Sequence, residues 1–287
     1  MAEIAYVNGR FVPLDQAFVH VEDRGYQFGD GVYEVVYAFN GIPFGLEEHV
    51  DRFFNSMNLI RIKAPCTKEE VMALVREAVQ RSGYGHAQIY FHITRGVSKR
   101  SHPFPDPSTP PGFVITVREA APLPAEKKEG GVAAYLTEDL RWSRCNIKSL
   151  NLLPNVLAKQ EALDRGAFEA ILCKEGYITE GAVSNVFIVS QGQVRTAPAD
   201  NKILPGITRQ HVIELCRRLG LELVEKPFTP EELYAAEEVF LTGSGIEVLP
   251  VVKINDTPVK DGQVGPVTRR LQEEYKKLII NHCGMYL

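Results

Sequence analysis

Hydrophobic and polar positions alternate in several short stretches of the chain, and this alternation predicts strands. Between residues 88 and 94, Ile89, Phe91 and Ile93 alternate with more polar neighbours, as expected for a strand with one wet face. Asn-Gly pairs at 8–9 and 40–41 favour hairpin turns, because their backbone matches the twist of the flanking strands. Strands are predicted at 5–7, 10–12, 32–39, 88–94, 113–117, 132–136, 170–173, 186–189 and 239–242.

Other stretches repeat their apolar positions with helical spacing. Leu46, Val50 and Met57 lie on one face of a predicted helix over 46–60. Thr67 and Glu70 form a possible capping box that opens a helix extending to about Gly83. Further helices are predicted at 155–165, 208–219 and 267–280. Since both halves mix strands with helices, the pattern predicts a mixed α/β (α+β) fold.

The chain divides where the pattern is interrupted. Residues 120–131 are rich in Pro, Gly and charge and contain the best linker candidate. We predict a small N-terminal α/β domain at 1–120, a linker at 121–131 and a larger C-terminal domain at 132–287. Residues 95–112, rich in Gly, Ser and Pro, read as a long loop, and loops of that length are usually functional or mobile.

Composition narrows the class of protein. The 287 residues are 45% hydrophobic and 24% charged, with a net charge of −4, which weighs against a nucleic-acid partner. No apolar run approaches the roughly 20 residues that span a bilayer, and the start shows no signal peptide, so we expect no membrane association. The five scattered cysteines form no metal spacing and no disulfide framework, so we expect reduced thiols and a cytoplasmic protein.

Lys148 is the first candidate for chemistry, because it stands in a mostly apolar stretch. Burial disfavours the ammonium form, and a neutral amine can attack an aldehyde to form a Schiff base. The more frequent interpretation of such a lysine, taken alone, is a side chain that extends to the surface.

Two polar turns are candidates for binding an anion. Leu204-Pro205-Gly206 leads into the predicted helix at 208–219, so the N–H groups of Ile207 and Thr208 could face a phosphate. Gly243 and Ser244 follow a predicted strand and could form a second polar loop around the same anion. A plain helix start and a simple turn are the alternatives.

Charged side chains elsewhere allow two interpretations each. Glu180 could be an exposed turn residue or a buried carboxylate paired with a ring N–H⁺. Arg100 and His102 could converge on one carboxylate or lie in a solvated basic loop. The histidines lack ligand spacing, so no metal is expected, and no Gly-x-Ser-x-Gly supports a serine hydrolase.

Taken together, these segments resemble the fold-type IV pyridoxal-phosphate enzymes over nearly the whole chain, most closely the D-amino-acid aminotransferase branch. The resemblance rests on a long set of spaced segments: Arg24–Glu34, Arg144–Asn151, Glu180, Asn185-Val186-Phe187, Val194-Arg195-Thr196 and Leu204–Arg209. It favours the chemical interpretation of Lys148, Glu180 and the 207–208 turn over the alternatives.

The resemblance implies a role for each matching residue. Lys148 would hold pyridoxal 5′-phosphate covalently and move the proton, and Glu180 would keep the pyridine nitrogen protonated. Leu204 would pack on the ring. The phosphate would be bound by Arg52, Ile207, Thr208, Gly243 and Ser244. The substrate carboxylate would be bound by Tyr33, Arg100 and His102, the last two contributed by the partner subunit of a homodimer.

The implied reaction moves an amino group from a D-amino acid such as D-alanine to a 2-oxo acid such as 2-oxoglutarate, in a ping-pong cycle through pyridoxamine phosphate. The Arg100-x-His102 pair is the reason for choosing the D enantiomer. Ala182, Val183 and the loop at 242–245 look closer to the branched-chain L-amino-acid aminotransferases, which are the alternative. An aminodeoxychorismate lyase is a third, less favoured alternative.

Overall fold

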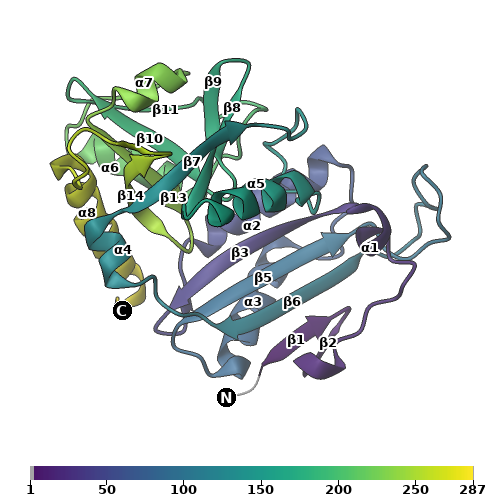
Figure 1. Ribbon diagram of the computed structural model, residues 1–287. Coiled ribbons are helices and arrows are strands. Elements are labelled where there is room, and N and C mark those ends of the chain that lie inside the picture. The colour runs from purple at the N-terminus through teal and green to yellow at the C-terminus, as the bar shows by residue number, and fades with distance from the viewer. Residues whose placement is uncertain (1–2, 287) are drawn as a thin grey trace. The chain divides into compact units, whose positions relative to one another are not determined.

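The computed structural model describes residues 3–286, and these residues pack as two compact units. One unit contains residues 3–121, 147–151 and 279–286, and the other contains 122–146 and 152–278. Figure 1 shows the elements of both. This division reflects packing, whereas the predicted domain boundaries were drawn along the sequence, and those boundaries stay a prediction.

Within the described residues, the first unit is built on a six-stranded antiparallel sheet in the order β2-β1-β6-β5-β3-β4. The predicted strands and both hairpins are confirmed, with Asn8 and Asn40 at positive φ in the turns. The strands are β1 (Ile4–Val7), β2 (Arg10–Pro13), β3 (Gly31–Phe39), β4 (Ile42–Pro43), β5 (Ala87–Thr94) and β6 (Gly112–Glu119).

Two long helices bury their apolar faces against this sheet. They are α2 (Leu46–Leu59) and α3 (Lys68–Ser82), and the predicted Thr67–Glu70 capping box is present at the start of α3. Phe53 of α2 and Phe91 of β5 meet edge to face in the core, with 5.0 Å between ring centroids. The sequence reading omitted the short helix α1 (Arg24–Phe28) and the 3₁₀ turn η1 (Leu14–Gln16).

The segment at 147–151 lies beside the first residues of β3 and is hydrogen-bonded to them. Val32 forms an isolated antiparallel bridge with Ser149, and the N–H of Tyr33 donates to the carbonyl of Lys148 over 2.9 Å. By packing, Lys148 therefore belongs to the unit formed mainly by the N-terminal half of the chain.

The second unit holds a mixed sheet of nine strands within the described residues. Its order is β12-β11-β10-β13-β14-β7-β8-β9, with β15 beside β14. The strands are β7 (Val132–Glu138), β8 (Glu169–Lys174), β9 (Tyr177–Gly181), β10 (Asn185–Ser190), β11 (Gln193–Thr196), β12 (Leu223–Glu225), β13 (Glu238–Gly243), β14 (Glu247–Ile254) and β15 (Thr257–Pro258). The predicted strands at 132–136, 170–173, 186–189 and 239–242 are confirmed.

Helices α5 (Leu153–Asp164), α6 (Ile207–Arg218), α7 (Pro230–Tyr234) and α8 (Pro266–Cys283) accompany this sheet. The three predicted helices are confirmed within three residues at either end. The segment expected as a linker contains a short helix, α4 (Ala125–Gly130), whose Lys128 forms an ion pair with Glu247.

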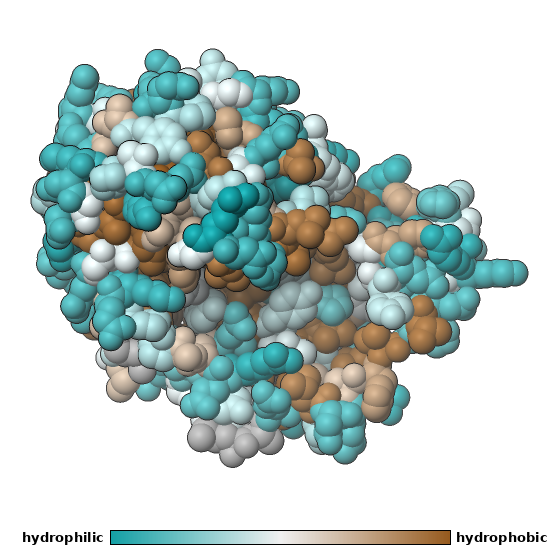
Figure 2. Space-filling view, viewed as in Figure 1, coloured by the Kyte–Doolittle hydropathy of each residue, from teal (hydrophilic) through white to brown (hydrophobic). Residues whose placement is uncertain are grey.

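Apolar side chains reach the surface on α5, where Leu153, Val156, Leu157 and Leu163 are each more than half exposed. In the first unit, Phe18 and the loop around it expose a second apolar group. Figure 2 shows brown, apolar side chains at the surface among hydrophilic ones. No helix in residues 3–286 is long and apolar enough to cross a membrane.

Candidate active site

Lys148 lies half-buried beside an aromatic side chain of β3. Its Nζ is 3.4 Å from the hydroxyl of Tyr33 and 4.4 Å from the centre of that ring. Its backbone N–H donates to the buried hydroxyl of Ser56 on α2. The bridge to β3 and the contact with α2 fix the backbone of the lysine, while the amine at the end of the side chain lies against a group that can exchange a proton with it.

Arg52 is held by a fully buried carboxylate. Its Nε and Nη2 each lie 2.8 Å from an oxygen of Glu34, and the Nδ1 of His49 lies 2.7 Å from the same carboxylate. Because an ionised carboxylate only accepts hydrogen bonds, the His49 ring must carry its proton on Nδ1. Burial opposes ionisation of Glu34, yet Arg52 and His49 lower its pKa to about 2. The guanidinium is thereby fixed in direction before any ligand arrives.

Arg100 and His102 lie in the loop between β5 and β6, and both are exposed. The guanidinium of Arg100 lies over the ring of Phe28 at 4.8 Å, and the ring of His102 is 5.6 Å from the same ring. The structure therefore brings both predicted carboxylate-binding residues to one aromatic side chain of their own unit.

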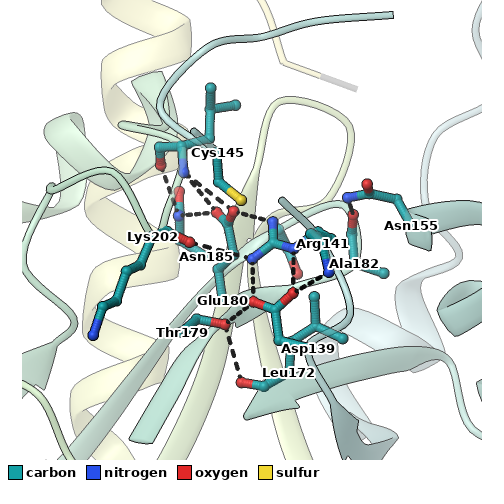
Figure 3. Close-up of polar contacts among 12 residues, drawn as sticks. Asp139, Arg141, Cys145, Asn155, Leu172, Thr179, Glu180, Ala182, Asn185 and Lys202 are labelled. Carbon is teal, nitrogen blue, oxygen red and sulfur yellow. Dashed lines mark hydrogen bonds and ion pairs between the residues drawn. The ribbon is translucent and has the colours of Figure 1, made fainter. Parts of the chain in front are cut away.

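Glu180 is the penultimate residue of β9 in the second unit, and its side chain is buried. Its carboxylate accepts hydrogen bonds from Nη1 of Arg141 at 2.5 Å, Nδ2 of Asn185 at 2.9 Å and the N–H of Leu204 at 3.1 Å. Figure 3 shows the Arg141 guanidinium lying between Glu180 and Asp139. The exposed-turn interpretation of Glu180 is therefore wrong, since its carboxylate is buried, and its pairing with a ring N–H⁺ stays a prediction.

Asp139 completes this cluster on the far side of Arg141. Its carboxylate accepts from Nε and Nη2 of Arg141 and from the hydroxyl of Thr179. Burial raises the pKa of Glu180 to about 7, although the Arg141 guanidinium acts in the opposite direction. For Asp139, burial is outweighed by the hydrogen bonds and charge of Arg141, and its pKa is lowered. Of the two carboxylates, Glu180 is therefore the one whose ionised form an additional cation would stabilise more.

The turn before α6 is shaped around Asn185. A Cβ on Gly206 would lie 2.1 Å from the Asn185 side-chain oxygen, so only glycine allows this close approach. Asn185 also donates to the carbonyl of Leu204, and Gly206 caps α6 without a side chain. The first N–H groups of α6, those of Ile207 and Thr208, begin a helix and so favour an anion.

The loop after β13 adjoins this turn through strand pairing. Thr242 pairs with Asn185 across β13 and β10, and Gly243 and Ser244 follow it. The Thr242 hydroxyl is buried and has no hydrogen-bond partner within the described residues. An unpaired buried hydroxyl is rare in native proteins, and a bound polar group is one way of satisfying it.

The predicted site residues therefore form two sets. In the first unit, Lys148 meets Tyr33, Arg52 meets Glu34, and the Arg100 loop meets Phe28. In the second unit, Glu180 contacts Leu204, whose turn leads to Ile207 and Thr208, next to the loop with Gly243 and Ser244.

Sequence reasoning missed the partners of these groups. From the sequence, no role was predicted for five of these partners, Asp139, Arg141, Glu34, His49 and Arg24. Glu34 could have been found, because it is a lone carboxylate on the apolar face of a strand. All five cysteines are free, and the described residues contain no group of three His, Cys, Asp or Glu placed to hold a metal.

Comparisons with known proteins identify the family to which the chain belongs. The sequence model of the amino-transferase class IV family matches residues 31–254. The chain is 42% identical to the D-alanine aminotransferase of Staphylococcus epidermidis over 277 residues, which are 96% of this chain and 98% of that protein. The fold of this chain is similar to that of the Escherichia coli branched-chain amino acid aminotransferase, with a TM-score of 0.91 and 30% identity over 97% of this chain and 95% of that one. It is also similar to the branched-chain aminotransferase of Thermobaculum terrenum in its PLP form, with a TM-score of 0.87 and 28% identity over 98% of this chain and 95% of that one.

The family match covers every predicted site residue, from Tyr33 to Ser244. A match of this length, together with the mixed two-sheet architecture and a full-length relative at 42% identity, establishes the resemblance seen in the sequence. The chain belongs to the class IV aminotransferases, whose fold is that of the fold-type IV enzymes.

Proposed function

We propose that this protein is a pyridoxal-phosphate-dependent D-amino-acid aminotransferase. The observation that carries the proposal is the buried Glu180 carboxylate, held by Arg141, Asn185 and the N–H of Leu204. A carboxylate fixed in this way suits a pyridine nitrogen that must stay protonated. Pyridoxal phosphate supplies an electron sink that stabilises negative charge at the substrate Cα.

The residues present fit this cofactor. Among residues 3–286 the buried hydroxyl of Thr242 has no hydrogen-bond partner, and α6 begins after Gly206 without a side-chain cap on its first N–H groups. We assign the phosphate to Arg52, Ile207, Thr208, Gly243 and Ser244, and the ring to Leu204 and Glu180. Lys148 would anchor the cofactor covalently.

Each of these side chains has a defined task in the proposed reaction. Lys148 would take the proton from the substrate Cα and deliver it to carbon C4′ of the cofactor, which requires an amine that is free to move. The Tyr33 hydroxyl, 3.4 Å from that amine, can hold it in position and also donate to the substrate carboxylate. Glu34 holds Arg52 rigid, so binding the phosphate requires little reordering of that side chain.

Arg100 and His102 would fix the substrate carboxylate and thereby select the enantiomer. Only one face of the cofactor can be served by a single lysine. A carboxylate held at a fixed place therefore decides which enantiomer directs its Cα–H at that lysine. The D-alanine aminotransferase relatives, at 40–42% identity, support the D-amino acid, with a 2-oxo acid such as 2-oxoglutarate as acceptor in a ping-pong cycle.

The second candidate is a branched-chain L-amino-acid aminotransferase. The similar solved structures named above are branched-chain enzymes, and Ala182 and Val183 are apolar where they follow Glu180 and Gly181. Higher identity to the D-alanine enzymes, 40–42% against 28–33%, favours the first candidate.

A homodimer is part of the proposal, with Arg100 and His102 serving the partner's cofactor. Both side chains are exposed and so are available to a second copy. The exposed apolar side chains of α5, seen among those of Figure 2, offer surface that a second copy could bury.

The test mixes the purified, cofactor-loaded protein with D-alanine and 2-oxoglutarate and measures pyruvate and D-glutamate. Formation of both products is expected, whereas L-leucine with 2-oxoglutarate should yield neither 4-methyl-2-oxopentanoate nor L-glutamate. Turnover of L-leucine without turnover of D-alanine would contradict the proposal and favour the branched-chain enzyme. Repeated turnover of aminodeoxychorismate to pyruvate without a 2-oxo acid would indicate a lyase instead, whereas D-alanine alone should yield at most one pyruvate per cofactor. Light scattering after size-exclusion chromatography measures the assembly, and a single-chain mass would contradict the homodimer.

A further inference from the structure

The loop that carries Arg100 and His102 is attached to α1 at several points along its length. At its start, Asp23 pairs with Val97 in an isolated bridge, and the N–H of Arg24 donates to the carbonyl of Gly96 over 2.9 Å. Gly96 has a φ of +96°, and a Cβ there would lie 2.1 Å from the carbonyl oxygen of Pro110. The two ends of the loop therefore approach each other where only glycine fits.

Arg24 holds the middle of the same loop. Its side chain is buried, its Nη1 donates to the carbonyl of Ser101 at 2.5 Å, and its Nη2 donates to the carbonyl of His102 at 3.3 Å. Its Nε lies 2.8 Å from the carboxylate of Asp30. One guanidinium thus fixes the backbone carbonyls of Ser101 and His102, and it does so with a planar fork of donors that a lysine lacks.

Asp30 connects this anchor to a second one. Its carboxylate also accepts from Arg95, whose guanidinium lies 3.7 Å from the ring centre of Phe104 further along the loop. Burial opposes ionisation of Asp30, but Arg95 and Arg24 together lower its pKa. The carboxylate therefore balances two buried guanidinium groups and ties both anchors together.

Phe28 supplies the contact with the side chains themselves. The guanidinium groups of Arg24 and Arg100 each lie 4.8 Å from its ring centre, and the ring of His102 lies 5.6 Å away. A cation over an aromatic face is stabilised by the ring quadrupole, so Phe28 restricts the directions that Arg100 can take. Phe28 and Arg24 belong to one helical turn, α1.

We propose that Arg24 and Phe28 are positioning residues for the carboxylate-binding pair Arg100 and His102, and therefore set the affinity for the substrate's α-carboxylate. This rests on the proposed function. A free loop would lose backbone and side-chain freedom on binding substrate, and the contacts with α1 remove that freedom beforehand. The carboxylate is thereby met by a preformed pair.

The test compares two amines that differ only at this group. The cofactor-loaded protein reacts in single turnover with D-alanine or with D-alaninol, which lacks the carboxylate, and the cofactor absorbance reports each rate. For Arg24→Ala we expect the second-order rate constant with D-alanine to fall about tenfold or more, while that with D-alaninol changes less than twofold. Phe28→Leu is expected to lower the D-alanine constant several-fold with the same selectivity.

Three controls make the result specific. Arg24→Lys keeps the charge facing Asp30 and should recover only part of the loss, which also covers the case in which Arg24→Ala fails to fold. Lys99→Ala removes an exposed charge from the same loop and should change neither rate. In a background with both Arg100→Ala and His102→Ala, Arg24→Ala should cause little further loss with D-alanine, because Arg24 acts through that pair.

Equal losses with D-alanine and D-alaninol, or no loss with either, would overturn the inference while leaving the proposed function intact. Additive losses from Arg24→Ala and from the combined Arg100→Ala and His102→Ala changes would also overturn it, since they would show independent roles. If the unmodified protein fails to react with D-alanine in this assay, the proposed function itself is contradicted and the inference falls with it.

Discussion

The amine of Lys148 lies 3.4 Å from the hydroxyl of Tyr33, and the backbone carbonyl of the same lysine accepts the N–H of the same tyrosine. Two contacts, one through the main chain and one through the side chains, thus join residues that are 115 positions apart in the sequence. The backbone contact fixes the main chain of the lysine, and the Tyr33 hydroxyl holds the amine at the end of its side chain.

Replacing Lys148 by alanine should abolish transamination and leave the fold intact, because the amine is both the cofactor anchor and the proton carrier. Borohydride reduction of the loaded protein, followed by peptide mapping, should place the label on position 148 in the unmodified chain only. Lys253→Ala, at an exposed position on β14, is the matched control and should retain full activity. Normal turnover by Lys148→Ala, or a label on another lysine, would refute its role.

Tyr33→Phe tests the hydroxyl separately from the ring. The ring contact with the amine is kept, while the donor to the substrate carboxylate is lost. A hydrogen bond to a charged group contributes about 1.5–3 kcal/mol, so KM for D-alanine should rise roughly 10- to 100-fold. Steady-state kinetics measure this, with Tyr37→Phe on the same strand as the control. An unchanged KM together with an unchanged kcat would exclude the hydroxyl from substrate binding.

The elements of the fold were largely predictable, because strands and helices depend on local periodicity. The capping box at Thr67 and the Asn-Gly hairpins are local signals, and the structure contains them as expected. The helices α1, α4 and α7 were not predicted, because five or six residues are too few to show a helical period. The strands β9, β11, β12, β14 and β15 were not predicted either, and in the sheet they are held by hydrogen bonds to other strands.

The site residues were predictable from a family resemblance, whereas their supports were not. Arg141 approaches Glu180 from 39 positions away, and Arg24 reaches Ser101 from 77 positions away. No spacing rule predicts such pairs, because they depend on which loops the fold brings together. Glu34 is the exception, since a carboxylate between Val32 and Val36 on a buried face must have a cationic partner.

Glu180→Gln should reduce transamination strongly while the cofactor still binds. The amide keeps the shape of the side chain but carries no negative charge, so it cannot hold a proton on the pyridine nitrogen. Loss of a preorganised charge at a developing charge costs about 2.7–4 kcal/mol, which corresponds to roughly 10²- to 10³-fold in kcat. Single-turnover rates and the cofactor absorbance measure both effects, and Glu175→Gln, in the exposed turn between β8 and β9, is the control. An unchanged rate would remove Glu180 from the mechanism.

The last prediction concerns the pH dependence of stability and depends on Glu34. Arg52 and His49 hold the pKa of this carboxyl at about 2 in the folded state, below the ordinary value of 4.5. The unfolded chain therefore binds more protons between these two values, and the contribution of Glu34 to stability is present above pH 4.5 and is lost as the pH falls towards 2.

Glu34→Gln should remove this dependence and take away the negative charge that faces the buried guanidinium of Arg52, at a cost of about 3–5 kcal/mol at neutral pH. The difference between the two proteins should narrow as the pH falls below 4.5, which urea unfolding of the apoprotein at several pH values measures. Glu77→Gln, at an exposed i,i+4 pair on α3, should show neither effect. A gap that stays constant from pH 7 to the acid limit would show that Glu34 does not carry its charge in the folded protein.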